Sequence, residues 1–333
     1  MDINGFLAGI LSGINSVVNN YGWSIVVFTI LIKLVLFPLD FKSRKSMRRM
    51  QMLQPEIAKL QKKYANDKEK LNQKTAELYR KEKINPMAGC LPMLLSMPIL
   101  FAMFAAMRMI AQTELAKQAI DLILTGEQTN ERWLWVKNLW MPDSPFAPTI
   151  ANLSNLEQVP LDIWKKVLAS LNMEQLSALA NLGEGLAITQ ETISGGQVFS
   201  ALAQCDVYTQ AIQKWGTMPQ INLFITNLEV FANPNGWFVL PLLAAASNFL
   251  ITLFQPQAPA SGENSQAAST NKLMKYFFPI FSLVICFGYN AGFSLYWVAS
   301  NLIAGVQGYA LTKFFNAQDK KAPSVIIGEG SLK

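Results

Sequence analysis

Long apolar stretches are the feature of this sequence that most constrains its fold. A helix that crosses a bilayer needs about 20 mostly apolar residues, and four regions meet that need: 23–39, 87–111, 237–254 and 276–311. The last is too long for one crossing, and residues 288–292 within it predict a tight turn. With 51% hydrophobic and 15% charged residues, the chain is predicted to be an all-α polytopic membrane protein with five transmembrane helices.

The charges of the connecting segments predict the orientation. Residues 42–85 hold 14 basic and five acidic side chains, whereas residues 112–236 hold six basic and twelve acidic ones. Because basic loops stay on the cytoplasmic side, we expect the first segment inside and the second outside. The N-terminus is then outside and the C-terminus is cytoplasmic.

These stretches and charges predict a division of the whole chain. It consists of an outer-surface interfacial helix (1–21), span 1 (22–41), a basic cytoplasmic helical hairpin (42–85), span 2 (86–111), an extracellular loop with a helical insertion (112–236), span 3 (237–254), a cytoplasmic loop (255–273), span 4 (274–289), span 5 (292–314) and a cytoplasmic tail (315–333). The first 20 residues are not expected to be a signal peptide, because they contain Asp2 and no Lys or Arg.

The basic segment has the pattern of two paired helices. Apolar residues recur at steps of three and four (50, 53, 57, 60 and 64), Asn66-Asp67 interrupts them, and residues 71, 78 and 79 continue the pattern. Its surface is either a solvated topology signal or a contact for anionic lipid, a ribosome or a targeting receptor. The candidate contact residues are Arg44, Lys45, Arg48, Arg49 and Met50.

One charged residue, Lys33, lies inside the first apolar stretch, about 9 to 14 Å from its cytoplasmic end. Either its long stem carries the ammonium back to the interface, or it marks a water-filled cavity. Polar residues in the later spans either form an interhelical hydrogen-bond network or share a hydrated groove with Lys33. They are Asn248, Thr252, Ser294, Ser300, Asn301 and Gln307.

Several classes of activity lack the residues they need. The chain has no His, and its three Cys form no CxxC pair, which argues against imidazole catalysis and a disulfide framework. Phosphate-loop, HExxH and GxSxG motifs are absent from the sequence. No carboxylate lies deep in a span, as a proton-coupled transporter would need. We therefore expect no enzyme, no cofactor and no metal.

The most specific segment reads Asn85-Pro86-Met87-Ala88-Gly89-Cys90-Leu91-Pro92, followed by Met97-Pro98-Ile99-Leu100-Phe101. On these residues the chain resembles the YidC/Oxa/Alb family of membrane protein insertases. The resemblance extends over about residues 20–112 and 237–315, and the short N-terminus looks like the five-span forms typical of Gram-positive bacteria. The signature residues are Asn85, Pro86, Gly89, Cys90, Pro92 and Pro98.

The resemblance implies an insertase and chaperone of the bacterial plasma membrane. It would move short polar tails and hydrophobic helices of client proteins from the cytoplasm into the lipid bilayer, through a hydrated, positively charged groove and without nucleotide hydrolysis. Lys33 would be the electrostatic anchor of this groove. The other groove residues would be Ser96, Asn248, Trp297, Asn301 and Gln307. Its implied partners are nascent membrane proteins and anionic lipids, together with the Sec translocon, the ribosome or the signal-recognition-particle receptor.

The sequence departs from the family pattern at two groove positions. Lys33 stands where Arg is usual, which keeps the charge but loses the bidentate fork, and Ser96 stands where Gln is common. Residues 152–229 look like an insertion with helix-like stretches at 161–171 and 173–182, and no chemistry is assigned to it. Two other functions stay open: a passive solute channel or transporter, and a helix-assembly chaperone that translocates nothing.

Overall fold

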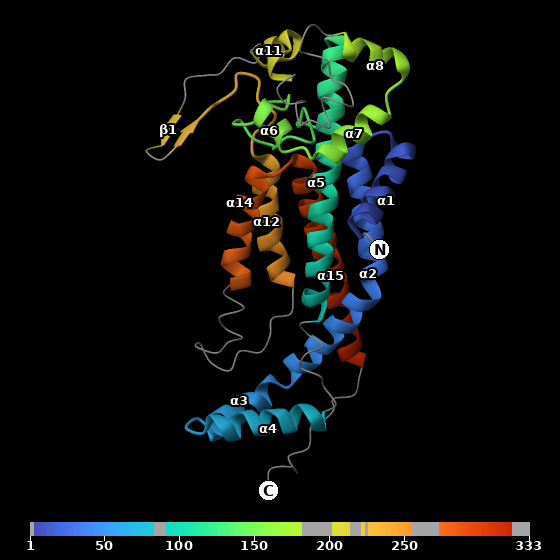
Figure 1. Ribbon diagram of the computed structural model, residues 1–333. Coiled ribbons are helices and arrows are strands. Elements are labelled where there is room, and N and C mark those ends of the chain that lie inside the picture. The colour runs from blue at the N-terminus through green and yellow to red at the C-terminus, as the bar shows by residue number, and fades with distance from the viewer. Residues whose placement is uncertain are drawn as a thin grey trace. The chain divides into compact units, whose positions relative to one another are not determined.

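The computed structural model describes residues 3–82, 91–181, 202–213, 221–223, 226–254 and 273–321. Helices dominate it, as predicted (Figure 1). They are α1 (Ile3–Val18), α2 (Tyr21–Met52), α3 (Gln54–Lys63), α4 (Lys68–Lys81), α5 (Leu91–Thr125), α6 (Leu153–Glu157), α7 (Leu161–Ala169), α8 (Met173–Ala180), α11 (Asp206–Gln213), α12 (Val239–Phe254), the π-helix η2 (Leu273–Phe277), α14 (Phe278–Gly288) and α15 (Ala291–Lys321). The exception to an all-α chain is a short antiparallel pair, β1 (Ile221–Leu223) and β2 (Thr226–Leu228), with Asn222 opposite Asn227.

The chain divides into two compact units, neither of which is continuous in sequence. The first unit consists of Met1–Thr29, Pro98–Ala245 and Phe281–Ala299. The second consists of Ile30–Met97, Ala246–Ile280 and Ser300–Lys333. The helices α2, α5, α12, α14 and α15 each contribute residues to both units. A prediction made segment by segment along the chain does not reveal such a division.

In the first unit, a loop (residues 126–152) is fixed by hydrogen bonds between its backbone and the side chain of Asn235. The backbone amide of Asn138 donates to Oδ1 of Asn235 at 2.7 Å. In return, Nδ2 of Asn235 donates to the carbonyl oxygens of Asn138, Met141 and Pro142 at 2.9, 3.1 and 2.9 Å. Both asparagines are fully buried. Since buried polar groups are costly unless they are paired, this network fixes the loop to the segment that precedes α12.

A buried carboxylate, that of Asp143, holds the start of α12. Its Oδ1 accepts from the Trp237 amide at 2.8 Å, and its Oδ2 accepts from the Leu240 amide at 2.7 Å and from Nε1 of Trp135 at 3.1 Å. An acidic side chain at a helix N-terminus satisfies free amides and complements the helix dipole. Gly236 makes room for it, because a Cβ there would lie 1.8 Å from Oδ1 of Asp143.

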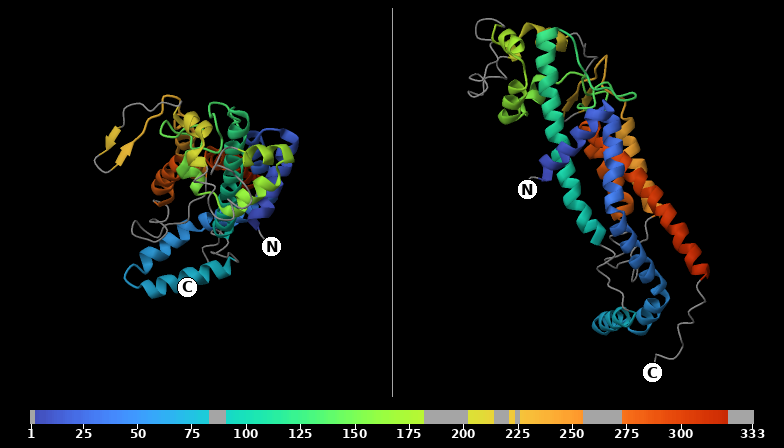
Figure 2. Two further views of the ribbon diagram at one scale, coloured as in Figure 1. Left: turned by 45° about the horizontal axis from the view of Figure 1, so that its top comes forward. Right: turned by 90° about the vertical axis from the view of Figure 1, so that its right-hand side faces the viewer.

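Helix α5 is longer than the span predicted at 86–111. It runs through Pro98 and past Ala111 to Thr125. The short helices α7, α8 and α11 gather around its C-terminal end (Figures 1 and 2). Helices α7 and α8 confirm the two helices expected at 161–171 and 173–182. The insertion is therefore organised around a continuation of the apolar helix.

In the second unit, α3 and α4 form the expected helical hairpin (Figure 1). Ile57 of α3 is buried, as are Met50 and Leu53 just before this helix. Asp67 caps α4, because its Oδ1 accepts from the Lys70 amide at 3.0 Å. Helix α2, however, does not end at the predicted boundary of span 1. It continues to Met52, so residues 42–52 belong to the same helix as Lys33 rather than to the hairpin.

In the part of the chain that the structure describes, two helices are long and apolar enough to cross a membrane: α2 and the part of α5 from Pro98 to Thr125. The apolar helices Ile3–Val18, Val239–Thr252 and Lys275–Gly288 are shorter, at 10–17 residues. Within the second unit, α2 exposes Leu31, Leu34 and Val35. Large exposed apolar side chains in a row mark a surface for lipid or another protein. These features belong to a helical membrane protein.

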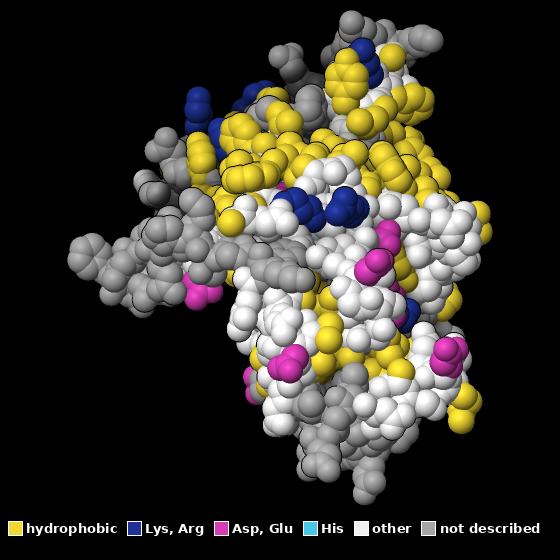
Figure 3. All heavy atoms as spheres, turned by 90° about the horizontal axis from the view of Figure 1, so that it is seen from above, with side chains coloured by type: hydrophobic (Ala, Val, Ile, Leu, Met, Phe, Trp, Pro, Cys, Tyr) yellow, Lys and Arg dark blue, Asp and Glu magenta, His cyan; other side chains and the backbone are white. Residues whose placement is uncertain are grey.

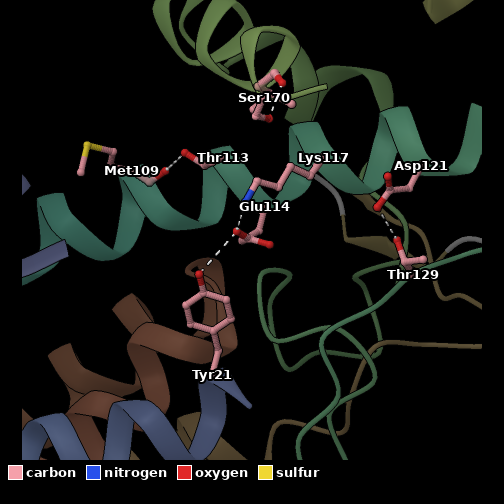
Figure 4. Close-up of polar contacts among 9 residues, drawn as sticks. Tyr21, Met109, Thr113, Glu114, Lys117, Asp121, Thr129 and Ser170 are labelled. Carbon is pink, nitrogen blue, oxygen red and sulfur yellow. Dashed lines mark hydrogen bonds and ion pairs between the residues drawn. The ribbon is translucent and has the colours of Figure 1, made fainter. Parts of the chain in front are cut away.

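At the start of α2, Tyr21 connects this helix to α5 and to the loop at residues 126–152. Its hydroxyl donates to Oε1 of Glu114 at 3.5 Å, and Lys117 pairs with the same oxygen at 2.9 Å (Figure 4). The Tyr21 amide donates to Oε1 of Glu131 at 2.8 Å. Burial raises the pKa of Glu131 above its usual value, and the nearby charge of Glu114 adds to this effect. The hydrogen bond from the Tyr21 amide lowers the pKa and partly offsets the rise.

The raised pKa of Glu131 predicts how stability depends on pH. The protonated carboxyl is favoured in the folded state, so its contribution to stability is complete below its unfolded pKa and is lost as pH rises through the folded pKa. Glu131→Gln keeps an acceptor for the Tyr21 amide and removes this loss. Between pH 4, below the ordinary glutamate pKa, and pH 8 in detergent, the melting temperature should fall less, by a few degrees, in Glu131→Gln than in the exposed control Glu127→Gln. Equal falls in the two variants would contradict the burial argument.

Candidate functional site

Lys33 lies half-buried on α2, in the second unit. Asp40 and Arg44 follow it by seven and eleven residues, so the three side chains leave the helix within about 40° of one another. The exposed apolar residues Leu31, Leu34 and Val35 point roughly 100–160° away from Lys33, whereas the less exposed Ile30 and Phe37 lie within about 60° of it. We call Lys33, Asp40 and Arg44 the charged face of α2. We call the side that exposes Leu31, Leu34 and Val35 the apolar face.

Arg44 is the most enclosed member of the charged face. Its side chain is 9% exposed, and its Nε donates to Oδ2 of Asp40 at 2.9 Å. The guanidinium lies against Gly308 of α15, where an added Cβ would be 3.0 Å from Nη1. Among the described residues, Nη1 has no hydrogen-bond partner. The absence of a side chain at position 308 therefore lets a charged group pack between α2 and α15.

Further contacts join α2 to α15 within the second unit. Nη2 of Arg48 donates to Oδ1 of Asn316, and the Arg48 guanidinium lies 5.8 Å from the Phe315 ring centre. The Phe41 and Phe315 ring centres are 5.3 Å apart. Of the residues expected to contact a cytoplasmic partner, Lys45 and Arg49 are exposed, whereas Arg44 and Met50 are buried. Helix α2 continues through this region, and its Arg44 and Met50 side chains pack inside the unit. They are therefore not free to contact a cytoplasmic partner.

The other predicted groove residues lie in different surroundings. In the second unit, Nδ2 of Asn301 donates to Oγ of Ser247 at 3.2 Å, which joins α15 to α12. Asn248 and Gln307 are half-buried on the same two helices. Trp297 belongs to the first unit, where it is buried with its ring 5.6 Å from that of Phe293. The hydrogen bond of Asn301 favours the interhelical-network interpretation for that residue.

The signature segment is only partly covered by the structure. Asn85, Pro86, Gly89 and Cys90 lie outside the described residues, as do the side chains of Pro92 and Ser96. Pro98 lies within α5, which continues through it. The roles expected for these residues stay predictions.

The charged face offers electrostatic interactions, because it carries a lysine and an Asp–Arg ion pair on one helix. Within the described ranges, no group of three or more His, Cys, Asp or Glu side chains could hold a metal ion. On the face at the top of Figure 1, acidic side chains are scattered in several places (Figure 3).

Two residues of this arrangement were missed from the sequence as functional candidates: Asp40 and Gly308. The spacing of Asp40 from Lys33 and Arg44, at i+7 and i−4, was a usable signal, since these intervals place residues on one helical face. Gly308 gave no signal, because its role depends on which helix packs against it.

A helical membrane protein with a charged face on one apolar helix is the class that these features define. A family model described as 60Kd inner membrane protein matches residues 13–191 and 197–319. A protein of Fusobacterium nucleatum named membrane protein insertase YidC is 30% identical over 308 residues, which make up 92% of this chain and 94% of that protein. The chain belongs to the 60Kd inner membrane protein family, the family of the YidC insertases.

Longer relatives match over a smaller part of their length. Proteins with the same name from Anaeromyxobacter dehalogenans and Leptospira interrogans are 42% and 38% identical over 142 and 165 residues. These matches cover 43% and 46% of this chain, but 23% and 24% of the relatives. The chain thus spans nearly all of the Fusobacterium protein and about a quarter of the other two.

Proposed function

We propose that this protein is an insertase, which moves short polar tails and hydrophobic helices of client proteins from the cytoplasm into the bilayer. The observation that carries the proposal is the match to a membrane protein insertase over 92% of the chain. The likeness extends across both units rather than one of them. The clients are nascent membrane proteins, and anionic lipids surround the basic hairpin.

The physical obstacle to insertion is the polar tail, which precedes its apolar helix across about 30 Å of hydrocarbon. A hydrated groove open to the cytoplasm shortens that path, and the Lys33 ammonium holds an acidic tail there transiently. The direction of Lys33 on α2, away from the exposed apolar face, supports this role. Asn248 and Gln307, which are half-buried in the same unit as Lys33, are the proposed groove residues beside it.

The energy for the step comes from sources other than nucleotide. A membrane potential contributes about 2.3 kcal/mol for each acidic charge moved outward across 100 mV. Burial of the client's apolar helix in lipid adds about 25 cal/mol for each Å² removed from water. These terms oppose the cost of moving the polar tail, so the process needs no ATP or GTP site in this chain.

The proposal includes a topology. Five spans cross the membrane, the N-terminus is outside, and the basic hairpin and the C-terminal tail are cytoplasmic. The net charges of residues 42–85 and 112–236 support this orientation. The exposed Lys45 and Arg49 lie near the hairpin, where a ribosome, a targeting receptor or the Sec translocon has access.

Site-specific photo-crosslinking tests the proposed function directly. A crosslinker at position 33 should capture a stalled nascent membrane protein, whereas one at position 34, which points about 100° away, should capture mainly lipid. Liposomes that hold the purified protein should insert a client without accumulating small solutes. Solute flux without client capture would establish a channel instead, and capture without insertion would establish a helix-assembly chaperone.

A further inference from the structure

The charged face of α2 contains a carboxylate within reach of the proposed anchor. Asp40 lies seven residues after Lys33, which is about 10 Å along the helix axis and about 20° around it. Lysine has a flexible four-carbon stem. An extended Lys33 side chain that leans toward the cytoplasmic end could therefore meet a free Asp40 carboxylate. Asp40 is 29% exposed, so its side chain has room to move.

Such a contact would compete with the client. Asp40 is attached to the same helix, so its effective concentration near Lys33 is high. An acidic client tail arrives from solution and must displace any carboxylate that already occupies the ammonium. An insertase that uses Lys33 as its anchor therefore needs Asp40 to be held elsewhere.

Arg44 provides that restraint in the structure. Its Nε donates to Oδ2 of Asp40 at 2.9 Å. Arg44 lies one helical turn beyond Asp40, on the side away from Lys33. The guanidinium cannot move freely, because it is enclosed between α2 and the bare backbone of Gly308. The immobile partner of Asp40 is thus Arg44, and the Asp40 carboxylate forms its ion pair with this guanidinium rather than with the Lys33 ammonium.

We propose that Arg44, held in place against Gly308, is a positioning residue that keeps Asp40 from neutralising Lys33 and so leaves Lys33 available to acidic client tails. This inference rests on the proposed function. It assigns to Arg44 a role inside the protein rather than in contact with a cytoplasmic partner. On this view Asp40 is the internal competitor of the client. Its charge would oppose the entry of acidic clients if Arg44 did not hold it.

A mutant cycle in reconstituted liposomes tests this role. Arg44→Gln should lower the insertion of an acidic-tailed client several-fold, and Arg44→Gln combined with Asp40→Asn should restore it. A client whose tail acids are changed to amides should be inserted equally by all variants. Lys42→Gln, which removes an exposed charge from the same helix, is the matched control and should leave both clients unaffected. In a Lys33→Gln background, Arg44→Gln should have no further effect.

Several outcomes would overturn the inference. If Arg44→Gln lowers the insertion of both clients equally, the residue supports only the fold. If the double variant stays as low as Arg44→Gln, Asp40 is not the competitor. Gly308→Val offers an independent route, because it displaces Arg44 without changing any charge, and it should reproduce the acidic-client defect and its rescue by Asp40→Asn. Normal insertion by Lys33→Gln alone would instead contradict the anchor role in the proposed function.

Discussion

Lys33→Gln should reduce the insertion of an acidic-tailed client by roughly 10- to 100-fold, and Lys33→Arg should preserve or improve it. A hydrogen bond to a charged partner contributes about 1.5–3 kcal/mol, and each 1.4 kcal/mol changes an equilibrium about tenfold. Glutamine is similar in reach but cannot attract a carboxylate by charge. Arginine keeps the charge and adds a second donor in a fixed geometry. The measurement is protease protection of the client's translocated tail in liposomes that contain the purified variant.

The charge of the client distinguishes this effect from general damage. With the acids of its tail changed to amides, the same client should be inserted equally by the wild type and by Lys33→Gln. Lys42→Gln removes one positive charge from an exposed position of α2 and should behave as the wild type does. Normal insertion of the acidic client by Lys33→Gln would remove the electrostatic role from Lys33.

Asp143→Ala should lower the free energy of unfolding by about 3 kcal/mol, because it leaves the buried Leu240 amide and two part-buried donors, the Trp237 amide and Nε1 of Trp135, without their carboxylate. For a chain of this size the loss corresponds to a fall of about 4 °C in melting temperature. Asp143→Asn should have a smaller effect, since one oxygen remains to accept. The measurement is thermal unfolding of the purified variants in detergent, followed by tryptophan fluorescence.

Gly236→Ala tests the same contact from the other side. Its Cβ would lie 1.8 Å from Oδ1 of Asp143, so either the backbone or the carboxylate must move. We expect a destabilisation similar to that of Asp143→Ala. Gly9→Ala is the control, because a Cβ at position 9 of α1 meets nothing within 4 Å. A melting temperature of Gly236→Ala within about 2 °C of the wild type would show that this contact is not needed for stability.

The sequence predicted those helices whose formation depends on the spacing of residues within the helix itself. The hairpin of α3 and α4 follows from apolar steps of three and four and from Asp67 at the turn, and α7 and α8 have the same kind of pattern. The continuation of α2 to Met52 was missed, because a change from apolar to charged residues was taken for the end of an element. Charge can change along a helix without interrupting its backbone hydrogen bonds.

Tertiary contacts account for the rest. The side chain of Asn235 binds the backbone of Asn138, 97 residues earlier in the chain, and no spacing rule connects the two residues. Lys33 could be singled out because a charge inside an apolar stretch is unusual. The Asp40–Arg44 pair was visible as an i, i+4 spacing, but its burial depends on Gly308, more than 260 residues later in the sequence. Only the packing of α15 on α2 reveals it.

The unbroken course of α2 determines how hybrids of this protein with its relatives have to be made. A graft cut at the expected membrane boundary would divide a continuous helix and separate Asp40 from Arg44. The natural junction is Leu53, where the helical backbone is interrupted before Gln54. Cytoplasmic modules exchanged at that residue would leave the charged face intact.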